Sequence, residues 1–241
     1  MSLLYSTDLA YIHNAGFREF AVRVAPELHR ILRAHGIGMG RIVEVGCGSG
    51  LVARYLSDRG YDVRGIDVSP AMIAIARATA PGARFRVASL MDARVPVCNA
   101  IVGVGEVLTY VPGGLPALRR FFLRAHAALR DGGVLIFDFL HTGRGRTYPA
   151  KTMRGTGWSI TVRAHVDPSG RTLTRRMAIE RSMAGRTRRS YETHRVRVYE
   201  RQRLAAVLAR CGFEVQMARA FGRLRLIAGD TAVVARKTGR I

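Results

Sequence analysis

The stretch Val43-Glu44-Val45-Gly46-Cys47-Gly48-Ser49-Gly50 decides the fold of this chain. An apolar strand is predicted over residues 41–45 and a helix over 51–58, so a strand, a glycine-rich turn and a helix follow one another. Glycines let the backbone turn tightly and approach a ligand closely, and the amides that open the helix can receive a carboxylate or a phosphate. The dinucleotide fingerprint G-x-G-x-x-G would need glycine where Leu51 stands, and Glu44 would repel a phosphate. The spacing therefore argues against a dinucleotide-binding dehydrogenase.

Outward from this turn, short apolar strands alternate with helices up to residue 140. Further strands are expected over 62–66, 85–88, 100–105 and 134–139, and helices over 70–80 and 115–129. Strands alternating with helices of this length predict a parallel sheet covered on both faces. Residues 36–140 are therefore expected to form a doubly wound α/β core, preceded by an N-terminal helical cap over 1–35 in which Pro26 starts a second helix.

After residue 140 the apolar period changes to two. Alternating stretches over 158–166, 173–180 and 188–200 predict a three-stranded antiparallel meander within an insertion at 141–200. A helix over 201–210 and strands over 214–219 and 231–235 follow, so residues 201–241 are expected to complete the core sheet.

A second landmark is Gly65-Ile66-Asp67-Val68-Ser69-Pro70. Asp67 ends the second predicted strand, 17 residues beyond Gly50. In doubly wound folds an acid at this place accepts hydrogen bonds from two ribose hydroxyls. The alternative is an aspartate that caps the next helix or turn.

Together these motifs resemble the class I S-adenosylmethionine (SAM)-dependent methyltransferases. The resemblance rests on E-x-G-C-G-x-G, on the acid followed by Val-Ser-Pro, and on Leu-x-x-Gly-Gly before an apolar strand. It covers residues 41–140 well and implies a seven-stranded, mostly parallel sheet with SAM as the cofactor. The meander resembles the lid-like insertion of several small-molecule methyltransferases in that superfamily.

The resemblance also implies which residues hold SAM. Carried over by position, the methionine portion would meet Glu44, Gly46, Gly48 and the carbonyl of Gly105, the ribose Asp67, and the adenine Val68, Met72, Ser89 and Leu90. An aromatic ring near the N-terminus could cover the sulfonium. Tyr11 is the candidate, with Tyr5 and His13 nearby, and ordinary helix packing is the alternative for all three.

The acceptor side is predicted from two segments. Glu106 and Tyr110 lie in the loop after the fourth strand, where Glu106 could bind a cationic amine, act as a base, or instead contact the SAM amino group. His194 and Tyr191 lie on the last meander strand, on opposite faces. His194 is the candidate base because a histidine side chain ordinarily changes its charge near neutral pH, and a solvated or core-edge histidine is the alternative. Tyr110 and Tyr191 are the candidate substrate contacts.

Composition limits the remaining choices. The chain has 241 residues and a formal net charge of +22, and residues 141–241 hold 23 Lys+Arg against 6 Asp+Glu. The three cysteines lie far apart with no CxxC pair, which indicates a reducing cytoplasm and no structural zinc or other metal. No apolar run is long enough to span a membrane, and the N-terminus lacks the pattern of a secretory signal.

The sequence therefore predicts a methyltransferase that acts on O or N of a small molecule. Two alternatives stay open. The first is RNA or DNA methylation through the Arg-rich C-terminal part, and the second is a non-catalytic SAM-binding module. The oligomeric state is open as well, and a homodimer is one of its forms.

Overall fold

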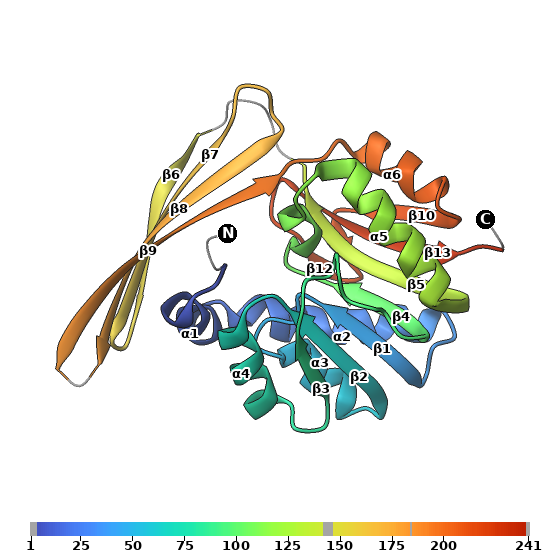
Figure 1. Ribbon diagram of the computed structural model, residues 1–241, viewed down its shortest axis with the longest axis horizontal. Helices are drawn as coiled ribbons and strands as arrows, with labels where there is room; N and C mark the ends of the chain where they lie inside the picture. Colours follow the sequence, from blue (N-terminus) through green and yellow to red (C-terminus); the bar gives the residue numbers. More distant parts are fainter. Residues whose placement is uncertain (1–3, 142–146, 184, 240–241) are drawn as a thin grey trace.

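Seven strands form the central sheet of the protein, whose computed structural model describes residues 4–141, 147–183 and 185–239 (Figure 1). The strands are β1 (Gly40–Val45), β2 (Tyr61–Asp67), β3 (Arg84–Val87), β4 (Cys98–Gly103), β5 (Leu129–Leu140), β10 (Phe213–Ala218) and β13 (Asp230–Lys237). Their order is β10-β13-β5-β4-β1-β2-β3, and only β13 runs antiparallel to its neighbours. The predicted doubly wound, mostly parallel sheet is confirmed. Residues 1–3, 142–146, 184 and 240–241 of the predicted segments lie outside the described residues.

Helices cover both faces of this sheet. They are α1 (Thr7–Gly16), α2 (Arg18–Ala34), α3 (Leu51–Ser57), α4 (Pro70–Thr79), α5 (Gly114–Ala128) and α6 (Arg201–Ala209), with a 3-10 turn η1 (Val107–Tyr110). Successive residues of a strand face opposite sides. Ile101 of β4 accordingly packs in the cluster that holds α5 and α6, whereas Ala100 and Val102 pack in the one that holds α2 and α3.

The prediction that Pro26 starts the second helix is wrong. Pro26 lies inside α2, and the break between the first two helices falls at Gly16 and Phe17. A proline removes one helical hydrogen bond, to the carbonyl four residues earlier. That residue is Val22, which is 50% exposed, so the lost bond falls on the solvent-facing side of α2.

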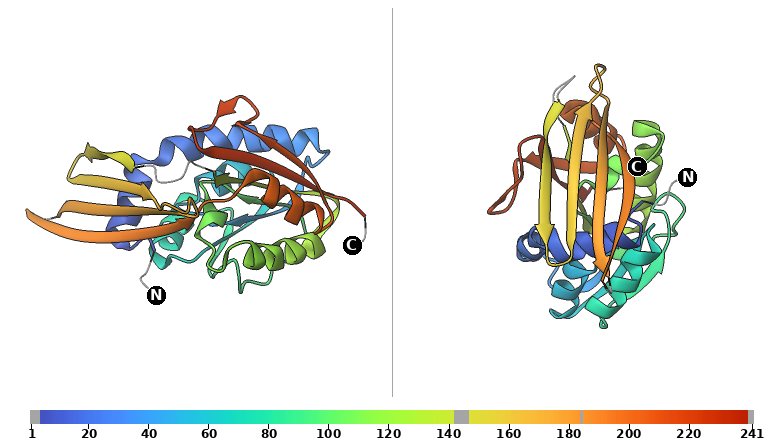
Figure 2. Two further views of the ribbon diagram at one scale, coloured as in Figure 1. Left: turned by 90° about the horizontal axis from the view of Figure 1, so that it is seen from above. Right: turned by 90° about the vertical axis from the view of Figure 1, so that its left-hand side faces the viewer.

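The insertion forms a separate antiparallel sheet that extends away from the core (Figures 1 and 2). Its strands are β6 (Thr147–Gly155), β7 (Trp158–Val166), β8 (Thr172–Met183) and β9 (Arg186–Arg197), in that order. We call this sheet the lid. The prediction of three strands is wrong, because β6 pairs with β7 as a fourth. A small hairpin of β11 (Ala220–Phe221) and β12 (Leu224–Arg225) was likewise not predicted.

The inner face of the lid packs on α1. Leu9 and Ile12 of α1 share an apolar cluster with Ile160 and Ile179 of the lid. Asp8, at the start of α1, accepts hydrogen bonds from Arg188, from Arg181 at 3.4 Å and from Ser190 at 3.3 Å. These contacts fix the N-terminal segment between the lid and the core.

Among the described residues, none of the helices combines the length and apolar character that crossing a membrane requires. In the same residues no three His, Cys, Asp or Glu side chains are gathered as metal ligands. The three cysteines are buried free thiols.

Candidate cofactor and acceptor site

The glycine-rich turn between β1 and α3 uses its glycines in two ways. Gly46, Gly48 and Gly50 all adopt left-handed backbone angles, with φ of 63°, 51° and 78°. A Cβ on Gly46 would lie 2.5 Å from Val107 of η1, and one on Gly50 would lie 3.0 Å from Ala76 of α4. These two glycines let neighbouring elements pack closely. A Cβ on Gly48 would meet nothing within 4 Å, so the space in front of Gly48 is open to a ligand.

Asp67, at the carboxyl end of β2, faces this turn. Its Oδ2 accepts a hydrogen bond from the amide of Gly48 at 2.9 Å, and its Oδ1 accepts one from the amide of Ser69 at 2.9 Å. The Ser69 hydroxyl accepts from the amide of Met72 at 3.2 Å and donates to the carbonyl of Tyr5 at 2.7 Å. Each carboxylate oxygen keeps acceptor capacity, as binding of ribose hydroxyls requires.

Glu44 is a buried acid with one carboxyl oxygen that is not hydrogen-bonded in the described residues. Its side chain is 3% exposed, and among the described residues its Oε2 has no hydrogen-bond partner. Burial, followed by the negative charge of Asp67, raises the pKa of Glu44 to about 8. A buried carboxyl oxygen without a partner is costly and calls for a donor. The ammonium and hydroxyl groups of SAM would supply such donors, so Glu44 and the open space at Gly48 fit the expected cofactor.

The loop after β4 is held by an acid that was not predicted. Asp138, in β5, accepts hydrogen bonds from the amides of Gly105 at 2.8 Å and Glu106 at 3.0 Å. Burial, and next the charge of Glu106, raises the pKa of Asp138 to about 7. A Cβ on Gly105 would meet nothing within 4 Å, so this loop also faces open space. The sequence signal for Asp138 was the presence of an acid inside the apolar run of β5.

Glu106 links this loop to the lid. Nη2 of Arg175, on β8, lies 2.9 Å from Oε1 and 2.7 Å from Oε2 of Glu106. Asp230, at the start of β13, is the third acid of the cluster, and burial with the charges of Glu106 and Asp138 raises its pKa to about 8. Oδ1 of Asp230 has no hydrogen-bond partner among the described residues. Three buried acids thus meet here. Among the described residues, Glu106 forms an ion pair with an arginine, whereas Asp138 and Asp230 do not.

The inner face of β9 brings a histidine to the same place. His194 is 2% exposed, and its Nε2 lies 2.8 Å from Oε2 of Glu192. Its Nδ1 lies 3.4 Å from the hydroxyl of Tyr110. Glu192 also accepts from the amides of Tyr5 at 3.0 Å and Ser6 at 2.9 Å. Because a carboxylate can only accept, Nε2 carries a proton and Nδ1 has the lone pair that can take one up, beside the Tyr110 hydroxyl.

The predicted adenine contacts lie at the ends of β2 and β3. Val68 is 50% exposed, whereas Met72, in the first turn of α4, is 2% exposed. The hydroxyl of Ser89 accepts from the amide of Met91 at 3.1 Å. The carbonyl of Leu90 accepts from Arg124 of α5 at 2.9 Å, which anchors this loop. The adenine role of these residues stays a prediction.

Two predicted site residues lie elsewhere. Tyr11 is 39% exposed with the guanidinium of Arg181 3.8 Å from its ring centroid, so it joins α1 to the lid instead of covering the cofactor turn. Tyr5 lies nearer that turn, because its carbonyl accepts from the Ser69 hydroxyl, and its ring is 5.1 Å from that of His194. Tyr191 is 78% exposed on the outer face of β9, because period-two alternation puts it on the face opposite His194.

Comparison with known proteins agrees with the fold described above. Residues 42–133 match the family described as a methyltransferase domain. A ubiquinone biosynthesis O-methyltransferase from Alkalilimnicola ehrlichii is 34% identical over 116 residues, which is 44% of this chain and 44% of that protein. The match therefore spans less than half of that relative's length.

Two further proteins match over most of their length. A dTDP-3-amino-3,6-dideoxy-alpha-D-glucopyranose N,N-dimethyltransferase from Streptomyces fradiae is 26% identical over 88% of this chain and 86% of its own. The structure of SAM-bound CalS10, an amino pentose methyltransferase from Micromonospora echinaspora, superposes with a TM-score of 0.77. It covers 94% of this chain and 97% of its own at 20% identity, which shows a shared fold.

Proposed function

We propose that this chain, which belongs to the class I SAM-dependent methyltransferases, transfers a methyl group to the nitrogen of a small-molecule amine. One observation carries the choice of nitrogen. Glu106, Asp138 and Asp230 bring three buried acids to the carboxyl edge of the sheet, and among the described residues Arg175 pairs with Glu106 alone. A site with more buried acids than bases suits an acceptor that arrives as an ammonium ion.

The cofactor half of the site rests on the first two βα junctions. Glu44, Gly48 and Gly105 would hold the methionine portion of SAM, and Asp67 its ribose. Gly46 shapes the turn around them. When bound, SAM supplies an electrophilic methyl group on its sulfonium.

His194 is the proposed base. An ammonium ion has no lone pair, so one proton must leave the acceptor nitrogen before it can attack. Nδ1 of His194 faces the acceptor side next to Tyr110, and Glu192 holds Nε2, so the proton would be taken up at Nδ1. Tyr5 and Tyr110 close the site against water, because their rings pack around His194 at centroid distances of 5.1 and 5.6 Å.

The relatives support a small-molecule acceptor. The Streptomyces fradiae relative, which aligns over most of both chains, is named for an amino sugar, and the Alkalilimnicola relative is named as an O-methyltransferase. An oxygen acceptor is therefore the second candidate, because the Alkalilimnicola relative is an O-methyltransferase by name.

Matched acceptor pairs test the proposal. The protein with SAM is offered amino sugars and the same sugars with a hydroxyl in place of the amine, and methylated products are detected by mass spectrometry. We expect methylation of at least one amine and of none of its hydroxyl partners. Methylation of hydroxyl partners alone would contradict the nitrogen assignment, and SAM binding without any turnover would support the non-catalytic alternative.

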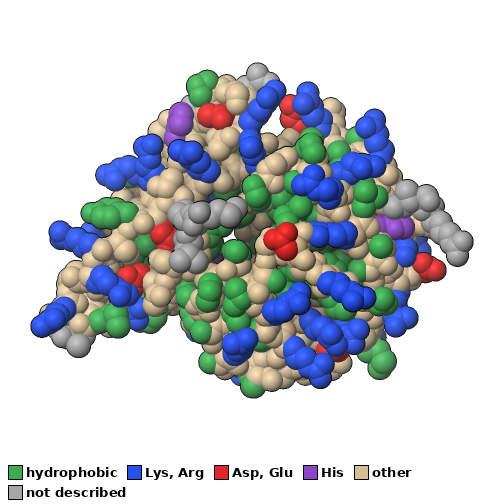
Figure 3. All heavy atoms as spheres, in the orientation of Figure 1, with side chains coloured by type: hydrophobic (Ala, Val, Ile, Leu, Met, Phe, Trp, Pro, Cys, Tyr) green, Lys and Arg blue, Asp and Glu red, His purple; other side chains and the backbone are tan. Residues whose placement is uncertain are grey.

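Nucleic acid is a weaker candidate partner. On the face shown in Figure 3, Lys and Arg side chains are spread over both lid and core with apolar groups between them, rather than forming one continuous stripe. A steep salt dependence of RNA or DNA binding would restore that candidate. We also propose a cytoplasmic location, supported by the three free thiols, and leave the homodimer as a prediction.

A further inference from the structure

Glu192, which holds the proposed base, is itself fixed by the N-terminal segment. Its Oε2 accepts from Nε2 of His194 at 2.8 Å and from the amide of Tyr5 at 3.0 Å. Its Oε1 accepts from the amide of Ser6 at 2.9 Å and from the Ser6 hydroxyl at 2.5 Å. A carboxylate offers about four acceptor positions, so these donors use all of them. The orientation of Glu192 therefore depends on two residues that lie 187 and 186 positions earlier in the chain.

These hydrogen bonds keep Glu192 charged in a buried place, where its side chain is 8% exposed. Burial alone would raise the pKa of Glu192, but the hydrogen bonds from His194 and Ser6 outweigh burial and hold the pKa below its usual value. An ionised carboxylate can only accept, so it keeps the ring proton on Nε2 and leaves Nδ1 beside the hydroxyl of Tyr110. The hydroxyl of Ser6 thus acts on the base through one intermediate.

Ser6 does not play the usual role of a serine at its position. It is the N-cap residue of α1, where a serine side chain ordinarily accepts from one of the first helical amides. Among the described residues its side chain makes no such bond, and its hydroxyl donates to Glu192 instead. The start of α1 therefore does not account for this hydroxyl.

Ser69 holds Tyr5 from the side of the core. The Ser69 hydroxyl donates to the carbonyl of Tyr5 at 2.7 Å, while the amide of Tyr5 donates to Glu192. Tyr5 has a left-handed backbone, with φ of 52°, which costs free energy and persists only where contacts hold it. The amide of Ser69 in turn donates to Asp67, the predicted ribose acid, at 2.9 Å. A row of hydrogen bonds therefore leads from the cofactor loop, through the backbone of Tyr5, to the base.

We propose that Ser6 and Ser69 are positioning residues for His194. Ser6 sets the carboxylate of Glu192, and Ser69 holds Tyr5 in the strained conformation that directs its amide to that carboxylate. Both serines act through Glu192 rather than on the histidine ring. The inference deepens the proposed function and rests on it in one respect, namely that His194 is the base of methyl transfer. The loop that holds the cofactor then also orients the base.

Proton NMR of the protein with isotope-labelled histidine tests the proposal without an acceptor. A ring proton held between Nε2 and a buried carboxylate gives a separate downfield signal, which His194→Ala assigns by its loss. Ser6→Ala and Ser69→Gly should each shift this signal and speed its exchange with water. Ser6→Thr and Ser69→Thr, which keep a hydroxyl, should restore the wild-type signal.

The choice of glycine at position 69 separates positioning from folding. Ser69 also caps α4, because its hydroxyl accepts from the amide of Met72 at 3.2 Å, and glycine is tolerated at an N-cap almost as well as serine. Ser69→Gly therefore removes the hydrogen bond to Tyr5 with little loss of helix stability. It should keep the wild-type affinity for S-adenosylhomocysteine, since the bond to Asp67 comes from the backbone amide.

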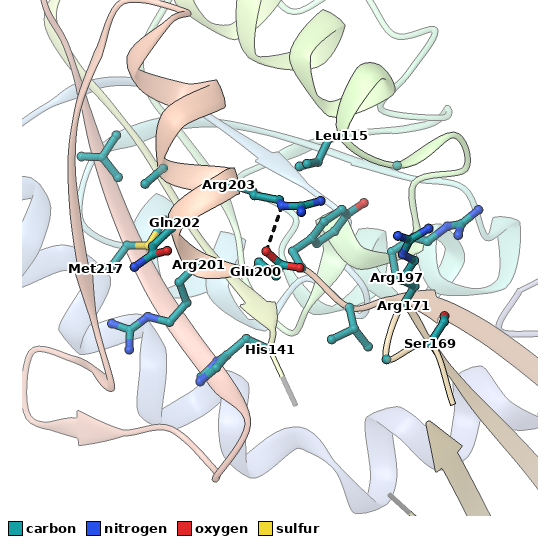
Figure 4. Close-up of a pocket in the computed structure, with 16 residues that line it drawn as sticks. Leu115, His141, Ser169, Arg171, Arg197, Glu200, Arg201, Gln202, Arg203 and Met217 are labelled. Atoms are coloured by element: carbon teal, nitrogen blue, oxygen red, sulfur yellow. Dashed lines mark ion pairs between the residues drawn. The ribbon is translucent and has the colours of Figure 1, made fainter. Parts of the chain in front are cut away.

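Ser169→Ala is the matched control. Ser169 lies in the turn between β7 and β8 and lines the cavity of about 980 Å³ where the lid joins α6 (Figure 4). Its hydroxyl also donates to a carboxylate, that of Asp167 at 2.8 Å. Ser169→Ala should leave the signal of His194 unchanged.

Turnover gives the second readout. With an amine that the matched acceptor pairs identify, Ser6→Ala and Ser69→Gly should lower kcat roughly tenfold, which is less than loss of the base itself. KM for the amine should stay near the wild-type value, because neither serine is proposed to bind it. The threonine variants should recover kcat together with the NMR signal.

Three results would overturn the proposal. They are absence of the downfield signal in the wild type, a wild-type signal in Ser6→Ala and Ser69→Gly, and an equal shift in Ser169→Ala. Failure of the proposed function has a different outcome. If the serine variants shift the signal while His194→Ala keeps the wild-type kcat, His194 is not the base and the positioning by the serines still holds.

Discussion

At the scale of single residues, backbone strain gathers at the candidate site. Tyr5 and Glu106, with φ of 52° and 61°, are the two non-glycine residues in the described ranges with a left-handed backbone. Such a conformation costs on the order of 1–3 kcal/mol and persists where surrounding contacts hold it. The amide of Tyr5 is held by Glu192, and the amide of Glu106 by Asp138. The site is therefore organised before any ligand arrives.

Buried acids make the stability of the ligand-free protein depend on pH. The pKa of Glu44 is raised to about 8, and those of Asp138 and Asp230 to about 7 and about 8. Between the unfolded and folded pKa values, the folded chain keeps protons that the unfolded chain has released. The free energy of unfolding therefore falls as pH rises. Histidines with lowered pKa values act in the opposite direction, but only below their ordinary value of 6.5.

We expect the free energy of unfolding in urea to fall between about pH 6.5 and about pH 8, with a slope of up to ~1.4 kcal/mol per pH unit for each titrating acid. Glu44→Gln should make this slope shallower. Asp131→Asn, at a side chain that is 98% exposed, should leave it unchanged. A slope that Glu44→Gln does not alter would show that Glu44 carries no proton in the folded state.

The proposed base gives a second prediction at this scale. His194→Ala should lower kcat by roughly 10²–10⁴-fold, the usual contribution of general base catalysis, and Glu192→Gln should lower it by less. Tyr191→Phe, on the outer face of the same strand, should keep the wild-type kcat. The measurement is steady-state formation of S-adenosylhomocysteine. A kcat within twofold of wild type in His194→Ala would remove His194 from the mechanism.

At the scale of elements, the lid is tied to the core by the pair of Arg175 on β8 and Glu106 after β4. Removing one partner of a buried ion pair leaves an uncompensated charge, which costs about 3 kcal/mol. Arg175→Met should therefore lower the free energy of unfolding by about that amount. Adding Glu106→Gln should restore part of it.

The pair of Arg189 and Glu180 is the control for this experiment. These side chains are 70% and 46% exposed, so Arg189→Ala should cost below about 1 kcal/mol. Chemical denaturation of the four proteins measures all of these changes. Equal effects of Arg175→Met and Arg189→Ala would mean that the lid is not anchored at Glu106.

The elements also show how far sequence patterns reach. The strands β7 and β8 could be predicted because alternate residues are apolar, which buries one face against α1 and the core, and β9 follows them with the same period of two. Strand β6 contains Pro149 and ends at Gly155, and most of its residues are exposed, so it has no apolar period. It forms because β7 offers a free edge, and its register shifts between Tyr148 and Lys151.

The same limit applies to the candidate site. The glycine turn with Gly46 and Gly48, and Asp67 at the end of the next strand, could be placed from the sequence because each lies in a short local motif, and their cofactor roles stay predictions. Glu192 lies two residues from His194 on the same strand face, so its contact with His194 could have been predicted from the alternation of the strand. The contribution of Arg175 depends on the docking of the lid, and that of Tyr5 on the path of the N-terminal segment. Neither the contact of Arg175 nor that of Tyr5 can be recognised from the residues next to it in the sequence.

At the scale of the whole molecule, the net charge of +22 does not concentrate in the candidate site. Many arginines pair locally with acids, as in the pairs of Arg41 with Asp62 and Arg203 with Glu200. The buried site instead holds an excess of acids, namely Glu106, Asp138 and Asp230 against Arg175.

The central claim is that the glycine-rich turn and Asp67 hold SAM, and calorimetric titration with S-adenosylhomocysteine tests it most directly. We predict binding at one site in the wild type and a loss of at least about tenfold in Asp67→Ala, since a hydrogen bond to a charged group is worth roughly 1.5–3 kcal/mol. Asp62→Ala, on the same strand but paired with Arg41 at 2.7 Å, should bind like the wild type. Absence of binding in the wild type, or equally tight binding by Asp67→Ala, would contradict the account.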